Sequence, residues 1–92
     1  MKQVRYAEQA IRELDAIFAW IASDNPAAAE RVLDRLDRTA ALLSQFRIGR
    51  PGRTPGTREL VVGRLPYIIV YSESADAITI LAVRHAARRP LG

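Results

Sequence analysis

The sequence of 92 residues contains no cysteine. This absence excludes disulfide bonds and thiolate metal sites, so the apolar core has to supply most of the folding stability. A chain of this length buries only about two-thirds of the surface that it exposes when unfolded, which predicts modest stability. The lack of disulfides fits a reducing cytoplasm, and we therefore expect a cytoplasmic protein.

Long hydrophobic runs are absent as well. No apolar run approaches the ~20 residues that a membrane-spanning helix needs, and the N-terminal MKQVRY lacks the apolar core of a signal peptide. We therefore expect no contact with a membrane.

A Walker phosphate loop and a dinucleotide fingerprint are also missing, so no cofactor is expected. Residues 49–52 read Gly-x-x-Gly, but Pro51 interrupts them, and they lie between a predicted helix and a predicted strand rather than between two helices, as an RNA-binding KH loop does.

Acidic residues are scarce in the C-terminal half. Residues 47–92 hold eight arginines and three acids, whereas residues 1–46 hold six basic and seven acidic residues. Thirteen of the fourteen cations are arginines, whose planar guanidinium groups suit forked contacts with phosphate or carboxylate. Two interpretations stay open: an anionic partner, either nucleic acid or an acidic protein segment, and a basic surface that contacts only water.

Residues 57–71 are the stretch around which the rest of the chain is organised. They predict two strands, residues 58–62 and 67–71, joined by a tight turn at Gly63-Arg64. The second strand is apolar or aromatic at every position, so it belongs in the middle of a sheet, with one face covered by helices and the other covered or kept for a partner. Gly63 is expected to supply the positive φ of the turn, and Pro66, which has no N–H, is expected at the start of the strand.

Two stretches carry apolar residues at helical spacing, one from residue 7 and one from about residue 26 to residue 46. Asn25, with Asp24 as the alternative, suits the N-cap of the second helix, and Pro26 suits its first position. So short a link predicts an antiparallel helical hairpin. The positions expected to face inward are Ala7, Ala10, Leu14, Ile17, Phe18 and Ile21 in the first helix, and Ala29, Val32, Leu33, Leu36, Ala40, Leu43 and Phe46 in the second.

The remaining segments complete the predicted order. Residues 2–6 are a candidate first strand, residues 45–57 are rich in glycine and proline and predict a loop, and residues 78–85 predict a last strand. Simple alternation would place Ile78, Ile80, Ala82 and Arg84 on one face of this strand and Thr79, Leu81, Val83 and His85 on the other. The prediction is therefore a single α+β domain, residues 1–92, with an N-terminal strand, an antiparallel two-helix hairpin and a three-stranded antiparallel meander.

Several segments resemble one family, and they keep its order and spacing over nearly the whole chain. They are DNPAAAER (residues 24–31), GRPG (49–52), PGTRELV (55–61), LPYIIVY (65–71) and ILAVRHAAR (80–88). Together they resemble the ParE/RelE toxin superfamily, and in particular its ParE-like, plasmid stabilisation branch.

The resemblance implies a fold of two helices on an antiparallel sheet and a toxin of a type II toxin–antitoxin module. It also implies a hetero-oligomer with a cognate antitoxin, expected to be a ribbon-helix-helix protein of the ParD type. ParE-like toxins poison DNA gyrase by binding, whereas RelE-like relatives cleave mRNA on the ribosome. A third possibility is a domain that has lost toxicity and keeps only antitoxin binding.

The chemistry of RNA cleavage separates the two toxic activities. Cleavage through the 2′-hydroxyl needs a proton acceptor, a proton donor and cations around the phosphate. Relatives that cleave mRNA carry an arginine where this chain has Ile68, and many end in a tyrosine, whereas His85 is followed here by two alanines. We therefore expect a gyrase inhibitor without catalytic residues. In the alternative, a ribonuclease, His85 would act as general acid, and Arg58 and Arg84 would hold the phosphate.

The candidate site residues follow from these expectations. Each also has a plainer explanation: Arg58 as a cation on the sheet surface, Trp20 and Tyr71 as packing, His85 as structural, and the last arginines as a solvated tail. The residues expected to contact the target are Arg58, Arg84, His85, Arg88 and Arg89, and those expected to contact the antitoxin are Trp20, Arg53 and Tyr71.

Overall fold

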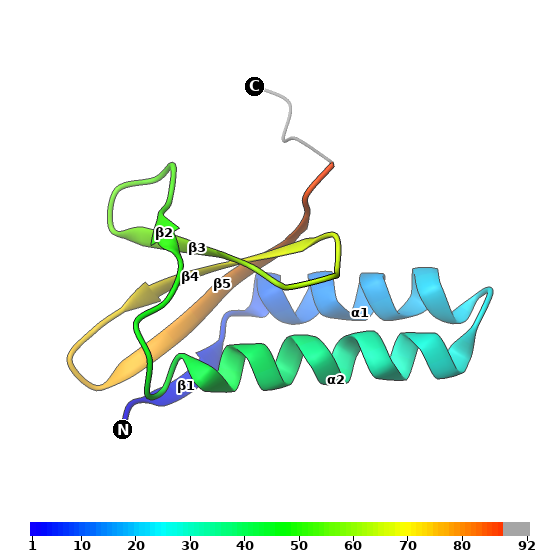
Figure 1. Ribbon diagram of the computed structural model, residues 1–92, viewed down its shortest axis with the longest axis horizontal. Coiled ribbons are helices and arrows are strands. Elements are labelled where there is room, and N and C mark those ends of the chain that lie inside the picture. The colour runs from blue at the N-terminus through cyan, green and yellow to red at the C-terminus, as the bar shows by residue number, and fades with distance from the viewer. Residues whose placement is uncertain (88–92) are drawn as a thin grey trace.

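The computed structural model describes residues 1–87, and it confirms an α+β fold of two helices and one sheet (Figure 1). The elements along the chain are β1 (Gln3–Tyr6), α1 (Glu8–Ala22), α2 (Pro26–Leu42), β2 (Arg50–Pro51), β3 (Thr57–Val61), β4 (Tyr67–Glu73) and β5 (Ala77–His85). Neither helix of this described part is long and apolar enough to cross a membrane.

The sheet has five strands in the order β1-β5-β4-β3-β2. The strands β2 to β5 pair antiparallel to their neighbours, whereas β1 pairs in parallel with β5, so the sheet is mixed. The strand β4 lies in the middle, as its continuous apolar run predicts. The two-residue strand β2 was missed because it lies in the predicted loop, and its Pro51 is tolerated since β2 is an edge strand.

The helical hairpin is capped as predicted. The Asn25 side-chain oxygen accepts a hydrogen bond from the backbone N–H of Ala28 at 3.0 Å, and Pro26 is the first residue of α2. The helix α2 ends at Leu42, short of the predicted end at residue 46, so Phe46 lies beyond it and is exposed.

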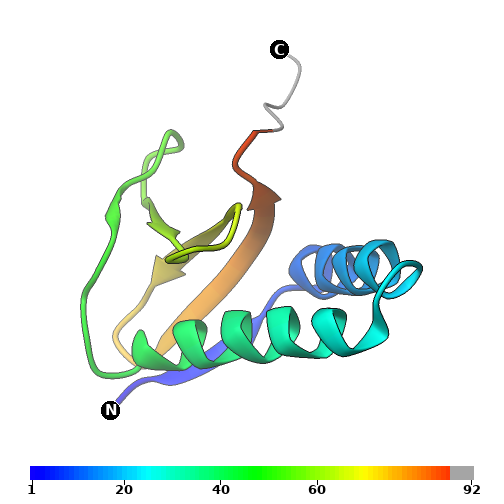
Figure 2. The same ribbon diagram turned by 45° about the vertical axis from the view of Figure 1, so that its right-hand side comes forward.

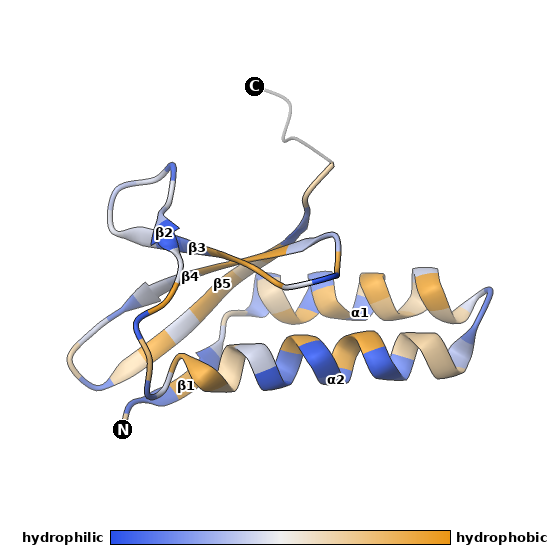
Figure 3. Cartoon of the chain, viewed as in Figure 1, coloured by the Kyte–Doolittle hydropathy of each residue, from blue (hydrophilic) through white to orange (hydrophobic). Residues whose placement is uncertain are grey.

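Both helices lie on one side of the sheet (Figures 1 and 2). Figure 3 shows apolar residues concentrated along β4 and β5 and alternating with polar residues along α2. The core lies between the helices and the sheet. It consists of Ala10 in α1, Leu36 and Ala40 in α2, Leu43 directly after α2, Val62 directly after β3, Tyr67, Ile69 and Tyr71 in β4, and Ile78, Ile80 and Val83 in β5. Alternation along β4 therefore turns Ile68 and Val70 to the opposite face, which we call the outer face of the sheet.

The prediction for α1 was wrong at Phe18, in the C-terminal half of the helix. Phe18, expected in the core, is exposed, and Trp20 is 71% exposed, which argues against its plainer explanation as packing. Ala10 is buried, while Leu14 and Ile17 are half-buried. The end of α1 extends past the strands that α1 could cover, so apolar spacing alone overestimates its burial.

A β-bulge changes which residues of β5 share a face. Val70 of β4 lies opposite Ala82, but the next residue, Tyr71, lies opposite Ile80, so Leu81 is an extra residue in β5. Beyond the bulge the alternation is reversed, and Val83 joins Ile80 in the core. The predicted grouping of Ala82 and Arg84 with Ile80 is therefore wrong, whereas Arg84 and His85 still face opposite sides.

The turn before β4 corrects the prediction for Gly63. Arg64, not Gly63, has the positive φ, at 64°, and the N–H of Leu65 donates to the carbonyl of Val62 at 3.2 Å. The Arg35 guanidinium of α2 donates to the Gly63 carbonyl at 2.8 Å, which attaches the turn to the helical layer. Pro66 directly precedes β4, as predicted.

Candidate functional site

The outer face of the sheet carries one continuous row of paired residues at the end of β5. Val61 of β3 lies opposite Ile68 of β4, and Ile68 lies opposite Arg84 of β5. Directly opposite residues in an antiparallel sheet place their side chains on the same face, about 5 Å apart. Val61 is 55% exposed, and Ile68 and Arg84 are half-buried. We call these three residues the outer row.

The next row on the same face contains a buried carboxylate. Glu59 lies between Arg50 and Val70 in the register and is only 8% exposed. One of its oxygens lies 3.6 Å from the Arg50 guanidinium, and the other accepts the backbone N–H of Arg53 at 3.3 Å. These contacts hold the loop between β2 and β3 against the sheet and compensate the carboxylate charge.

His85 lies on the face opposite to Arg84. Its ring packs edge-on against Tyr67, with 5.5 Å between ring centroids, and Tyr67 belongs to the core between sheet and helices. Its Nδ1 accepts the backbone N–H of Ala87 at 3.1 Å. The imidazole is therefore engaged by the Tyr67 ring and by the backbone N–H of Ala87.

Arg58 and Tyr71 support the segment that follows α2. They lie opposite each other in the sheet, and Arg58 Nη2 donates to the Gly49 carbonyl at 2.7 Å. The Tyr71 hydroxyl donates to the Ile48 carbonyl, and its side chain is buried. Arg58 Nε is buried and has no hydrogen-bond partner among residues 1–87. Arg58 is therefore not the exposed surface cation that its place in the sequence suggested.

The three residues of the alternative nuclease do not converge. Arg84 points to the outer face, whereas His85 and Arg58 lie on the helix-facing side. On that side, His85 lies opposite Tyr67 of β4, and Arg58 lies opposite Tyr71 of the same strand. Tyr67 and Tyr71 are four residues apart, so at ~3.3 Å per residue the two positions are separated by about 13 Å along the strand. No single point on the sheet brings the proton donor and both guanidinium groups together.

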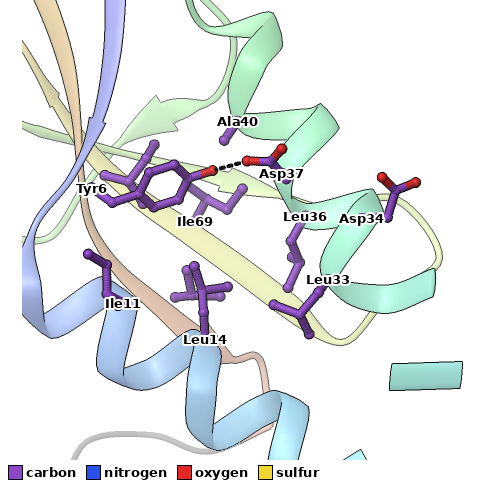
Figure 4. Close-up of a pocket in the computed structure, with 11 residues that line it drawn as sticks. Tyr6, Ile11, Leu14, Leu33, Asp34, Leu36, Asp37, Ala40 and Ile69 are labelled. Atoms are coloured by element: carbon purple, nitrogen blue, oxygen red, sulfur yellow. Dashed lines mark hydrogen bonds between the residues drawn. The ribbon is translucent and has the colours of Figure 1, made fainter. Parts of the chain in front are cut away.

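A groove opens between the two helices and the sheet, with a volume of about 430 Å³ (Figure 4). It is lined by Tyr6, Ile11, Leu14, Leu33, Asp34, Leu36, Asp37, Ala40, Ile69, Ile80 and Val83. The walls are apolar, and the polar groups are the Tyr6 hydroxyl and the carboxylates of Asp34 and Asp37. From the sequence we expected uncovered apolar surface only on the face of the sheet away from the helices, so this groove was missed. The one signal in the sequence was Ile11, an apolar residue outside the predicted core stripe of the first helix.

The polar groups of the groove are tied to each other or to α2. The Tyr6 hydroxyl donates to Asp37 at 2.8 Å, as the dashed line in Figure 4 marks. Burial of Tyr6, together with the hydrogen bond and the negative charge of Asp37, raises the pKa of the Tyr6 hydroxyl above its usual value. Asp34 forms an ion pair with Arg38 at 2.7 Å, one turn further along the helix.

The residues expected to contact the antitoxin lie in three separate places. Trp20 is exposed near the end of α1, Arg53 is exposed in the loop between β2 and β3, and Tyr71 is buried in the core. The end of α1 and that loop lie at opposite ends of the molecule (Figure 1). Arg88 and Arg89 fall outside the described residues. Within residues 1–87, no group of three or more side chains is suited to holding a metal ion.

Comparison with known proteins identifies the family. The family described as "ParE toxin of type II toxin-antitoxin system, parDE" matches residues 4–90. The chain belongs to this ParE toxin family. Among its relatives, protein Y4kP of Sinorhizobium fredii is 45% identical over 86 residues, covering 92% of this chain and 88% of Y4kP. Toxin RelE3 of Caulobacter vibrioides is 33% identical over 92 residues, covering 97% of this chain and 99% of RelE3.

Solved structures agree with this family assignment. This ParE-family chain matches a chain of the chromosomal ParDE toxin–antitoxin system from P. aeruginosa with a TM-score of 0.84 and 25% identity, over 92% of this chain and 96% of that one. The isolated E. coli RelE toxin matches with a TM-score of 0.63 and 15% identity, over 97% of this chain and 88% of RelE, and shares the fold. The predicted family and fold are both confirmed, at the level of a type II toxin of the ParE/RelE superfamily.

Proposed function

We propose that this toxin acts by binding DNA gyrase and carries out no chemistry of its own. The observation that supports binding over RNA cleavage is the pair formed by Ile68 and Arg84 on the outer face, with His85 on the opposite side. A phosphate clamp would need several cations at one point, and a proton donor within reach of the leaving oxygen. The outer row offers one guanidinium, two apolar side chains and no proton donor.

The same proposal includes a ribbon-helix-helix antitoxin of the ParD type. The groove between α1, α2 and the sheet leaves apolar side chains such as Ile11 open to water, and it is large enough for the apolar side chains of a partner helix. The arginines of residues 47–92 would attract an acidic stretch of the same antitoxin. An antitoxin that buries the groove should also stabilise the toxin by mass action.

Induction of the toxin without its antitoxin tests the target. We expect filamentation, DNA-damage signalling and inhibition of supercoiling by purified gyrase, with no new mRNA 5′ ends. The variant His85→Ala should leave growth arrest unchanged, because binding needs no proton donor. New mRNA ends that appear on induction and vanish in His85→Ala would overturn the gyrase proposal and establish a ribonuclease.

Paired substitutions on α2 test the antitoxin surface. Leu33→Glu places a charge in the groove, whereas Leu42→Glu places the same charge on an exposed position of α2 outside it. We expect Leu33→Glu to weaken antitoxin binding by about tenfold or more, in the range of a buried interface residue, and Leu42→Glu to leave it unchanged. Equal binding by both variants would exclude the groove as the antitoxin surface.

A further inference from the structure

We propose that the outer row, Val61, Ile68 and Arg84, is the surface through which the toxin contacts its target, and that it fits an acidic protein segment carrying an aliphatic side chain. The inference rests on the proposed function, because it assumes that the toxin acts by binding a protein. It adds which face of the sheet is used and what chemistry that face recognises.

The geometry of the row supports a contact surface. The three residues occupy directly paired positions on three adjacent strands, so their side chains form one patch on a rigid sheet. Neither helix covers this face, since both lie on the other side (Figure 2). Val61 is more than half exposed. The edge strand β2 pairs with β3 only at Arg58 and Glu59, so it does not extend as far as Val61.

The charge of the row selects an anionic partner. Within residues 1–87, the Arg84 guanidinium has no hydrogen bond and no ion pair, so its donors are available to a carboxylate. Arg50, one row away, is already partnered by Glu59. Arg84 can make a forked contact to a carboxylate, and arginine is among the residues enriched in binding hot spots. Val61 and Ile68 lie beside it and offer an aliphatic surface to an apolar side chain of the same segment.

The same face argues against RNA as the partner. Sequence-tolerant binding of single-stranded RNA uses aromatic side chains on which bases stack, together with several cations along the backbone. In the described part of the chain, Tyr6, Tyr67 and Tyr71 face the helices, and the other aromatic residues lie on α1 or just after α2, so none belongs to the outer face. The other arginine near this face, Arg50, is paired with Glu59, so Arg84 is left as a single cation rather than one of several along a backbone.

The outer row and the groove lie on opposite sides of the sheet, so target contact and antitoxin contact can be changed separately. The test uses Val61→Glu and Arg84→Glu in the full chain, with Leu42→Glu and Arg12→Glu as matched controls for an added carboxylate and a reversed charge on the helices. Each variant is co-purified with its antitoxin and melted, to establish that it folds. Binding to immobilised gyrase holoenzyme and growth arrest on induction are then measured.

We expect Val61→Glu and Arg84→Glu to bind gyrase about tenfold or more weakly and to lose growth arrest, with both controls unchanged. Folded outer-row variants that bind gyrase like the unmodified chain would overturn the inference and leave the gyrase proposal intact. If the unmodified chain arrests growth without binding gyrase, the gyrase proposal fails, and growth arrest becomes the test of the outer row. Loss of growth arrest in both outer-row variants then supports the outer row as the target surface, and unchanged growth arrest overturns it. An unmodified chain that neither binds gyrase nor arrests growth overturns both the gyrase proposal and the outer-row inference. Cleavage of mRNA that depends on Arg84 would mean that the partner of the outer row is RNA rather than a protein.

Discussion

The carboxylate of Glu13 on α1 accepts a hydrogen bond from the backbone N–H of Val83 on β5, with 2.9 Å between the two atoms. This contact lies on the edge of β5 that faces away from β4, at a point where that edge has no neighbouring strand, because β1 pairs with β5 only as far as Ile80. Beyond that point the helix takes the place of the missing strand, and Glu13 supplies the acceptor that a strand carbonyl would otherwise provide. One side chain thus prevents an unpaired backbone donor at the edge of β5.

Removal of this acceptor should destabilise the fold. Glu13→Ala is expected to lower the free energy of unfolding by about 1–3 kcal/mol, because the N–H of the buried Val83 loses its partner. Asp15→Ala, an exposed position of the same helix, is the matched control and should change the stability by less than about 0.5 kcal/mol. Urea denaturation followed by circular dichroism measures both, and equal effects would show that the Glu13 contact contributes nothing.

Tyr6 should make stability depend on alkaline pH. Its pKa is raised in the folded state, so above the ordinary value of about 10 the unfolded chain loses this proton while the folded chain keeps it. The stabilisation is complete below pH 10 and is lost as the pH rises above it, by about 1 kcal/mol or less at pH 11. Unfolding free energies of the unmodified chain and Tyr6→Phe, compared at pH 8 and pH 11, measure this. A difference that does not change with pH would contradict the assignment.

The features of the fold that could be predicted are those with a local signal. The N-cap at Asn25 depends on residues within one helical turn, and the central place of β4 follows from its unbroken apolar run. The parallel pairing of β1 with β5 joins segments more than seventy residues apart, and the sequence of β1 does not specify its neighbour. The bulge at Leu81 has no glycine or other local marker, so strict alternation gave the wrong faces beyond it.

The turn before β4 offers a direct comparison of two neighbouring residues. Gly63 has an ordinary φ, and an added Cβ would meet its nearest atom, in the Arg35 side chain, at 3.6 Å, so Gly63→Ala should be nearly neutral. Arg64 holds a left-handed φ that costs a non-glycine residue about 1 kcal/mol, so Arg64→Gly should raise the melting temperature slightly. Thermal melts of both variants check this, and strong destabilisation by Gly63→Ala would restore the original prediction.

The candidate site was predictable only in part, for a similar reason. Arg84 could be selected because the sequence places it beside His85 at the end of a strand, and alternation correctly separates the two. Its neighbours Ile68 and Val61 become visible only through the register of three strands, which no local pattern reports. The groove exists because the two helices do not pack completely against each other and the sheet. How completely they pack depends on the shapes of the side chains and not on the spacing of apolar residues in the sequence.

The separation of Arg84 and His85 leads to a final prediction. Ile68→Arg would place a second guanidinium directly opposite Arg84, and a phosphate clamp of this kind is worth about 10²–10³ in rate where a complete catalytic site exists. The variant should nevertheless show no ribosome-dependent cleavage of mRNA, since the imidazole of His85 packs against Tyr67 on the other face. On the outer face, both oxygens of the Glu59 carboxylate are already engaged, one by Arg50 and the other by the backbone N–H of Arg53.

Mapping of mRNA 5′ ends after induction compares Ile68→Arg with the unmodified chain, and thermal melts establish that the variant folds. We expect neither chain to produce new ends, and Ile68→Arg to arrest growth less because it replaces an aliphatic side chain of the outer row. A missing proton donor costs about 10²–10⁴ in rate, so a restored clamp alone leaves cleavage too slow to detect. New ends in Ile68→Arg that disappear when His85→Ala is added would mean that His85 reaches the outer face, and the separation of the two faces would then be wrong.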